Sequence, residues 1–130
     1  MGESYTAICS GCGHRFKASE GGGFLFELLH CARCGAEKSI PHESLGDCFK
    51  GYIKGLGIPF AGATMGRDRR IGATYQGPIV SEEEFHAAVE KAAGMCECGG
   101  WFRLNAPPRC PKCRSARFRC DPEGEYVCYD

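Results

Sequence analysis

Residues 9–13 read Cys-Ser-Gly-Cys-Gly, and residues 31–35 repeat the pattern as Cys-Ala-Arg-Cys-Gly. Two cysteines three positions apart on a tight turn can direct both sulfurs at one metal ion. The glycine after each pair favours the left-handed backbone conformation that suits such a turn. The 18 residues between the two turns also fit the spacing of a four-cysteine zinc site. We therefore predict a first metal site with the ligands Cys9, Cys12, Cys31 and Cys34.

A second group of cysteines lies toward the C-terminal end of the chain. One residue separates Cys96 from Cys98, and a further 11 residues separate Cys98 from the sequence Cys110-Pro111-Lys112-Cys113. The C-x-C spacing is less usual than C-x-x-C. We predict a second metal site with the ligands Cys96, Cys98, Cys110 and Cys113. The alternative is a site in which Cys120 or Cys128 replaces Cys96 or Cys98.

The composition favours metal sites over disulfides. Of 130 residues, 11 are cysteine and 19 are glycine, and only 43% are hydrophobic, which is a small supply for a conventional core. The N-terminus has no basic region followed by an apolar stretch, so we expect no secretory signal and a cytoplasmic location. Cysteine patterns in a reducing cytosol indicate metal or catalytic sites, and an odd count cannot pair completely within one molecule. No run approaches the roughly 20 apolar residues of a membrane helix.

The cysteine turns at residues 9–13 and 31–35 resemble the knuckles of zinc-ribbon and rubredoxin-like proteins, and Cys110-Pro111-Lys112-Cys113 is similar to one knuckle of a second ribbon. The resemblance covers about half the chain and implies a β-hairpin ribbon around each metal, with the cysteines as ligands. The whole chain is also similar to small bacterial zinc-ribbon proteins without an assigned activity. Because ribbons serve many functions, the resemblance implies a fold and not an activity.

The expected fold is a small metal-stabilised α+β protein with two four-cysteine zinc ribbons. We expect residues 1–40 to form the first ribbon and residues 96–130 to form the second ribbon with an acidic tail. Residues 41–95 form a Gly-rich linker that contains at least one helix. The expected cofactors are two Zn²⁺ ions, and iron is the alternative metal because four thiolates accommodate either.

The clearest predicted helix covers about residues 82–93. Ser81 and Glu84 have the spacing of a capping box, and Gly94 provides a C-terminal stop. A weaker helical pattern covers about residues 42–54, and we interpret residues 55–80 mostly as loop because they are rich in glycine. Cys48 on the weaker helix is interpreted as a core residue, and Cys120 and Cys128 as cysteines without a metal role.

The charge distribution bears on whether the protein binds nucleic acid. The formal net charge is zero, and eight thiolates with two Zn²⁺ would make the protein mildly acidic, which is unusual for a nucleic-acid-binding protein. Residues 103–119 nevertheless carry a strip of basic residues and no acidic one. The strip comprises Arg103, Arg109, Lys112, Arg114, Arg117 and Arg119. These cations either neutralise the thiolates nearby or contact phosphates, with Trp101 as a stacking platform for bases.

The sequence contains none of the common catalytic motifs, and a zinc ion held by four thiolates has no open coordination position for catalysis. We therefore predict a non-enzymatic interaction module that recognises a protein partner. One alternative is a nucleic-acid-binding regulator that uses the basic strip. Another is an iron-binding, rubredoxin-like protein with a redox or thiol-sensing role. The sequence does not indicate an oligomeric state.

Overall fold

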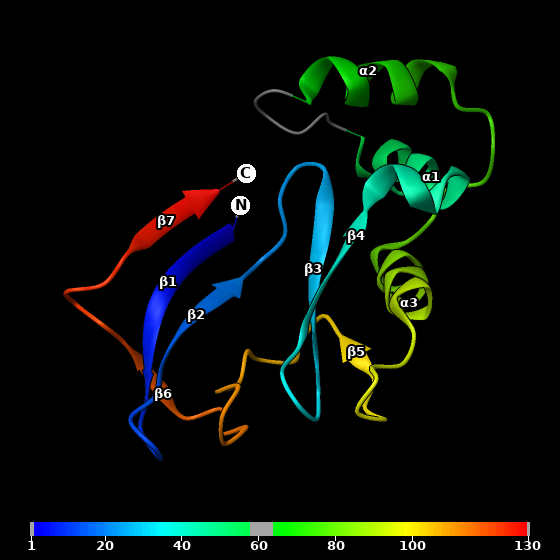
Figure 1. Ribbon diagram of the computed structural model, residues 1–130. Helices are drawn as coiled ribbons and strands as arrows, with labels where there is room; N and C mark the ends of the chain where they lie inside the picture. Colours follow the sequence, from blue (N-terminus) through cyan, green and yellow to red (C-terminus); the bar gives the residue numbers. More distant parts are fainter. Residues whose placement is uncertain (1, 58–63, 130) are drawn as a thin grey trace.

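The computed structural model describes residues 2–57 and 64–129, and its strands form two antiparallel sheets (Figure 1). The first sheet consists of β1 (Gly2–Cys9), β2 (Arg15–Glu20), β6 (Phe118–Cys120) and β7 (Tyr126–Tyr129). β1 is central: β2 pairs along one edge, and β6 and β7 pair in succession along the other. The two ends of the described chain therefore lie side by side, with Gly2 opposite Tyr129.

The second sheet is built in the same way around a different hairpin. Its strands are β3 (Phe26–Cys31), β4 (Glu37–Pro41) and β5 (Phe102–Arg103). β3 is central, with β4 on one edge and the short β5 on the other. Each sheet thus combines a hairpin from the first 41 residues with strands from the C-terminal part of the chain: β6 and β7 in the first sheet, and β5 in the second. In both hairpins the turn between the strands is a cysteine turn.

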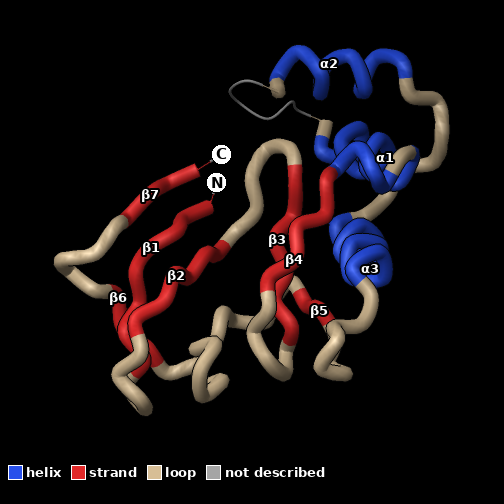
Figure 2. The backbone as a smooth tube through the Cα atoms, viewed as in Figure 1, coloured by secondary structure: helices blue, strands red, loops and turns tan. Residues whose placement is uncertain are grey.

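The helices of the described residues lie between the second hairpin and β5 in the sequence, and they gather beside the second sheet (Figure 2). The helices are η1 (His42–Leu45), α1 (Asp47–Leu56), α2 (Met65–Thr74) and α3 (Glu82–Ala93). The small α+β fold with two cysteine groups near hairpins and helices in the middle is confirmed.

The predicted helix at about residues 82–93 is confirmed as α3. The Ser81 Oγ accepts a hydrogen bond from the backbone N–H of Glu84, with an N–O distance of 3.1 Å. The Ser81 hydroxyl also donates a hydrogen bond to the Glu84 carboxylate at 3.0 Å. The Glu84 side chain therefore bonds to the Ser81 side chain. Gly94 follows the helix with φ +73°, a conformation that glycine adopts without strain.

The weaker helical pattern forms two helices instead of one. Gly46 has φ +56° and ψ −126°, and it separates η1 from α1. Phe49 and Ile53 of α1 are buried in the main core. The interpretation of residues 55–80 as mostly loop is wrong for Met65–Thr74, which forms α2. Part of that stretch, residues 58–63, lies outside the described residues.

The sequence pattern did not predict α2, because the buried residue of this helix is polar. Its sequence contains two glycines and few apolar residues, and Asp68 is its buried residue. The helix is held by contacts made elsewhere in the chain: the Arg67 guanidinium lies 5.0 Å from the centre of the Phe49 ring and donates to the Phe24 carbonyl at 3.2 Å. Periodicity of apolar residues cannot show a helix that packs through an arginine.

The main core lies between the second sheet and the helices. Leu29 of β3 and Phe85 and Val89 of α3 are almost completely buried there. Burial of one such side chain stabilises the fold by about 1.5–3 kcal/mol. A much smaller core of Tyr5, Ala7 and Ala18 supports the first sheet. The first sheet therefore has less apolar stabilisation of its own than the second.

No helix in residues 2–57 and 64–129 has the length and apolar character needed to cross a membrane.

Candidate metal centres

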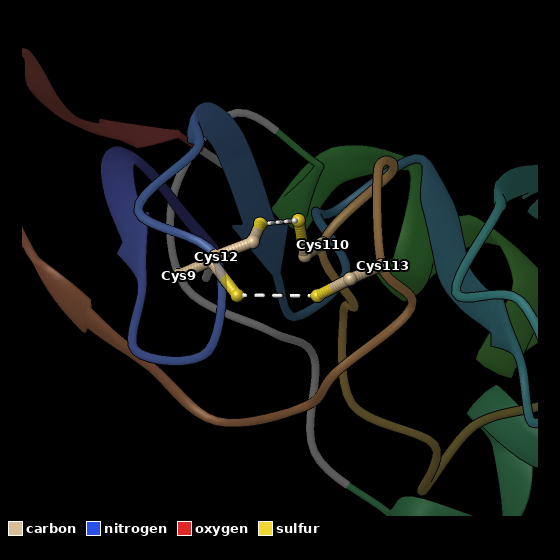
Figure 3. Close-up of side chains that lie close together, drawn as sticks. All are labelled: Cys9, Cys12, Cys110 and Cys113. Atoms are coloured by element: carbon tan, nitrogen blue, oxygen red, sulfur yellow. Dashed lines mark hydrogen bonds between the residues drawn. The ribbon is translucent and has the colours of Figure 1, made fainter.

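Site 1 joins the two ends of the chain. Cys9 and Cys12 come from the turn between β1 and β2, and Cys110 and Cys113 come from the segment that leads into β6. Figure 3 shows the four sulfurs directed toward one another. The Sγ–Sγ distance is 3.4 Å between Cys9 and Cys113 and 3.6 Å between Cys12 and Cys110.

Site 2 lies at the edge of the main core. Cys31 and Cys34 come from the turn between β3 and β4, and Cys96 and Cys98 come from the turn between α3 and β5. The Sγ–Sγ distance is 3.5 Å between Cys31 and Cys98 and 3.6 Å between Cys34 and Cys96. Cys31 is fully buried and packs in the core with Phe102.

The sulfur spacing fits a tetrahedral metal ion. In each site the four sulfurs all lie within 4.8 Å of one another. Sulfurs about 2.3 Å from a tetrahedral Zn²⁺ are about 3.8 Å apart, whereas disulfide-bonded sulfurs are about 2.05 Å apart. All 11 cysteines are free thiols. The two groups of four therefore have the donor chemistry and the spacing of metal sites.

Three of the four turns share one pattern of backbone hydrogen bonds. The N–H of the first cysteine donates to the carbonyl five residues later, and the residue after the second cysteine donates back to the first cysteine's carbonyl. At Cys9 these bonds involve His14 and Gly13, both at 2.9 Å. The turns that begin at Cys31 and at Cys110 repeat them. The local sequence thus determines the pairing of sulfurs within a turn.

The fourth turn is the same structure shortened by one residue. The Cys96 N–H donates to the Gly100 carbonyl at 2.7 Å, and the Gly99 N–H donates to the Cys96 carbonyl at 2.9 Å. Gly99 has φ +91°, like the glycines that follow the C-x-x-C turns. The C-x-C spacing is therefore compatible with the same arrangement of ligands.

Backbone N–H groups also stabilise individual thiolates. Hydrogen bonds from the N–H groups of Cys12 and Gly11 lower the pKa of Cys9 to about 6. Burial opposes ionisation of Cys31, but N–H groups of Cys34 and Arg33 more than offset it and lower the pKa of Cys31 to about 6. Neighbouring thiols raise the pKa of Cys113 to about 12, despite an opposing N–H bond from Ser115. Four thiolates this close together need a cation to neutralise them.

The eight cysteines are the predicted ligands, but their division between the two sites differs from the sequence prediction. We predicted Cys9, Cys12, Cys31 and Cys34 in one site and Cys96, Cys98, Cys110 and Cys113 in the other. The structure nests the turns instead: Cys9 and Cys12 lie with Cys110 and Cys113, and Cys31 and Cys34 lie with Cys96 and Cys98. Sites with Cys120 or Cys128 in place of Cys96 or Cys98 are not formed.

Long-range strand pairing explains this correction. β5 pairs with β3, with Phe102 opposite Cys31, and this brings the Cys96–Gly100 turn to Cys31 and Cys34. β6 pairs with β1, with Phe118 opposite Cys9, and this brings Cys110 and Cys113 to the first turn. The spacing of cysteines along the chain carries no information about these strand pairs. Both sites therefore combine residues from the predicted segments 1–40 and 96–130.

The two sites touch each other through Gly35 and Arg109. A Cβ atom on Gly35 would lie 2.4 Å from the Arg109 Cβ and 2.7 Å from its backbone N. Gly35 follows the second turn, which belongs to site 2, and Arg109 immediately precedes Cys110 of site 1. Only a residue without a side chain allows this approach of the two backbones.

The sites differ in exposure. In site 1, Cys12 and Cys113 are exposed while Cys9 and Cys110 are buried. In site 2, Cys31 is buried and the other three cysteines are half-buried. Solvent therefore reaches two sulfurs of site 1 more readily than those of site 2.

The three remaining cysteines lie outside both sites. Cys48 is half-buried and packs against the main core, and burial raises its pKa; it lies at the edge of the core and not in its interior. Cys120 and Cys128 are exposed on β6 and β7. They pair with different ends of β1, opposite Ala7 and Glu3.

The structure separates the residues of the basic strip. Arg103 forms an ion pair with Glu90 at 3.2 Å, and Arg109 donates to the Arg114 carbonyl at 3.1 Å. The other four are exposed along residues 112–119, from the Cys110–Cys113 turn into β6, and their side chains make no hydrogen bond or ion pair within the described residues. These four are Lys112, Arg114, Arg117 and Arg119. Trp101 is not part of this surface, because it flanks the fourth turn at site 2.

Sequence reasoning overlooked the conformation of Arg114. It is the non-glycine residue with positive φ, +63°, in residues 2–57 and 64–129. It occupies the place that glycine takes after Cys12 and Cys34. Alignment of the three C-x-x-C turns by their cysteines would have revealed it as the exception.

Residues 5–119 match the profile of a family described as Domain of unknown function (DUF8255). Searches of the curated proteins and of the solved structures found no match. The matched segment contains all eight cysteines of the two sites and most of both sheets. The chain belongs to the family described as Domain of unknown function (DUF8255).

Proposed function

We propose that the protein is a non-enzymatic interaction module in which two Zn²⁺ ions have a structural role. The observation that supports this proposal is the donor set: within residues 2–57 and 64–129, each group of potential ligands consists of four cysteines. Four thiolates complete the tetrahedral shell of zinc, so neither ion has a position for water or substrate. At site 1 the ion would join strands of the first sheet, which has the smaller apolar core.

The surface beside site 2 supports a protein as the partner. Met95 and Trp101 form an antiparallel bridge across the fourth turn, so their side chains emerge on the same side. They are 60% and 52% exposed. Arg33 lies alongside and donates to the Cys98 carbonyl at 3.0 Å. Methionine, tryptophan and arginine are enriched at the centres of protein interfaces.

The test compares the proteins captured by the wild type and by a Met95→Ala/Trp101→Ala variant. We expect a specific partner to be lost by the variant and retained by Val127→Ala, which removes an equally exposed side chain on β7, 53% exposed. Both variants should keep two metal ions per chain. Equal capture by the wild type and the double variant would contradict the proposed surface.

Metal analysis tests the identity of the ions. We expect about two zinc ions per chain after removal of any affinity tag. Iron–thiolate absorbance in the visible range would instead support the redox alternative, because four thiolates also accommodate iron. A single ion per chain would contradict the two-site assignment.

A nucleic-acid-binding role is the second candidate, because four exposed cations lie along residues 112–119, from the Cys110–Cys113 turn into β6. Fluorescence anisotropy with labelled single-stranded RNA and DNA would test it over a range of salt concentrations. If phosphates bind there, Arg114→Ala/Arg117→Ala should weaken binding and flatten its salt dependence. Trp101→Ala should have little effect, because Trp101 lies at site 2. Salt-insensitive binding, or binding unchanged in the double variant, would contradict this role.

A further inference from the structure

A cavity of about 480 Å³ lies at the junction of η1, α1 and α2, away from both metal sites. Its walls come from the segment between β2 and β3, the end of β4 and the three helices. This volume is within the range of about 300–1,000 Å³ that is typical of small-molecule sites. The proposed interaction surface at site 2 does not use any residue of this cavity.

Most of the surface that lines the cavity is apolar. Phe49 of α1 is 4% exposed and also belongs to the main core. Ile71 of α2 and Pro41 at the end of β4 add further apolar surface. Leu25 remains 60% exposed although it borders the cavity. An organic molecule that covered Leu25 would remove this apolar surface from water.

The charged groups that border the cavity are mainly positive. Lys50, Arg67 and Arg70 line it together with a single acidic residue, Glu43. Arg67 is held in the wall by an ion pair with Asp68 at 2.9 Å and by its position over the Phe49 ring.

The other two cations are available to a ligand. The Arg70 side chain makes no hydrogen bond or ion pair within residues 2–57 and 64–129. Lys50 makes only a 3.9 Å contact with Asp47, whose side chain is 84% exposed. Such an exposed pair contributes little stability, so it competes weakly with an anionic ligand.

We propose that this cavity binds a small amphipathic organic anion. The apolar body of the ligand lies against Phe49, Ile71 and Leu25, and its acidic group meets Arg70 and Lys50. A carboxylate suits the planar guanidinium of Arg70, which can donate two parallel hydrogen bonds. A neutral molecule of the same shape gains the apolar contacts and lacks the attraction to the two cations.

The test is a titration of the metal-loaded, ¹⁵N-labelled full chain with octanoate, followed by amide chemical shifts. 1-Octanol and octylammonium serve as probes of the same length with a different charge. We expect saturable shifts of Gly46, Lys50 and Ile71 with octanoate at millimolar concentration. The affinity for 1-octanol should be several-fold lower, and octylammonium should be weaker still.

Two charge reversals on α2 locate the acidic group. Arg70→Glu should lower the affinity for octanoate by about fivefold to tenfold. Arg69→Glu is the matched control, because Arg69 is exposed on the same helix and does not border the cavity. If Arg70→Glu does not fold, Lys50→Glu tests the same attraction from α1.

Three outcomes would overturn the proposal. They are equal affinity for octanoate and 1-octanol, an equal loss in Arg69→Glu and Arg70→Glu, and the absence of saturable shifts in the cavity residues.

Discussion

At the residue scale, two glycines in equivalent turns have different surroundings. Gly13 has φ +75° and Gly35 has φ +81°, so any side chain at either position adopts a strained backbone conformation. A Cβ at Gly13 would meet nothing within 4 Å, whereas a Cβ at Gly35 would collide with the backbone of Arg109. Gly35 therefore has a second role, which is to allow site 2 to lie against site 1.

This difference gives a matched pair of variants. Gly13→Ala should cost about 1 kcal/mol of unfolding free energy through its left-handed conformation alone. Gly35→Ala should cost clearly more, because its methyl group separates the two sites. Chemical denaturation of the metal-loaded variants measures both values. Equal losses would show that the contact between Gly35 and Arg109 is unimportant.

Arg114 occupies the equivalent position after the Cys110–Cys113 turn, where a residue with a side chain has the conformation that favours glycine. Its φ of +63° strains the backbone, and the backbone carbonyl that accepts from Arg109 does not depend on its side chain. Arg114→Gly should relieve the strain and stabilise the protein by about 0.5–1 kcal/mol, after the entropy cost of glycine is subtracted.

Thermal denaturation measures this gain against Arg117→Gly, which replaces an exposed arginine whose φ is not positive. The control should be neutral or destabilising. A loss of stability in Arg114→Gly would show that the arginine side chain supports the turn.

At the scale of elements, α3 depends on signals close to its own ends. Ser81 caps its first turn, three acidic residues follow, and Gly94 ends it. These features are visible in the sequence, and the helix was predicted to within a residue. α2 has no side-chain cap at its start. Its position depends instead on the contact of Arg67 with Phe49 and on the buried Asp68. Elements with local signals could be predicted, and an element stabilised by distant contacts could not.

Ser81→Ala tests the contribution of the cap. The variant should lose about 1 kcal/mol of unfolding free energy, because the Glu84 N–H loses its acceptor. Ser39→Ala is the control, since Ser39 is an exposed serine on β4. Urea denaturation followed by circular dichroism provides the measurement. An equal effect of the two variants would contradict the importance of the cap.

At the scale of the whole molecule, the ligands could be predicted and their partition could not. The sequence of each turn places its own two sulfurs, as the repeated N–H bonds at Cys9 and Cys31 illustrate. Which turns share an ion depends on β5 pairing with β3 and on β6 pairing with β1. β5 has two residues and β6 has three, too few for a recognisable strand pattern.

The exposure of the two sites predicts the order in which they lose metal. A chelator should remove the ion from site 1 first, because Cys12 and Cys113 are exposed. After loss of one ion, an alkylating reagent should label site 1 cysteines. The α-helical circular dichroism should persist, since the helices pack beside site 2. Initial labelling of Cys31 and Cys34 would contradict this order.

Acid should also release the metal. The pKa values of Cys9 and Cys31, each about 6, lie below the ordinary thiol value of 9.0. A lowered pKa means that the thiolate stabilises the folded protein at high pH, and that this stabilisation disappears as the pH falls through about 6. A bound cation stabilises the thiolates further, so metal should be retained at neutral pH and released only at a pH well below this value. Unchanged metal content in strong acid would contradict thiolate ligation.

The nested partition of the cysteines is tested most directly with ¹¹³Cd in place of the native ions. A proton–cadmium correlation spectrum connects each cadmium to the Hβ atoms of its own ligands. We expect one cadmium to correlate with Cys9, Cys12, Cys110 and Cys113, and the other with Cys31, Cys34, Cys96 and Cys98. One cadmium that correlates with both Cys9 and Cys31 would contradict the nested arrangement and the strand pairing that produces it.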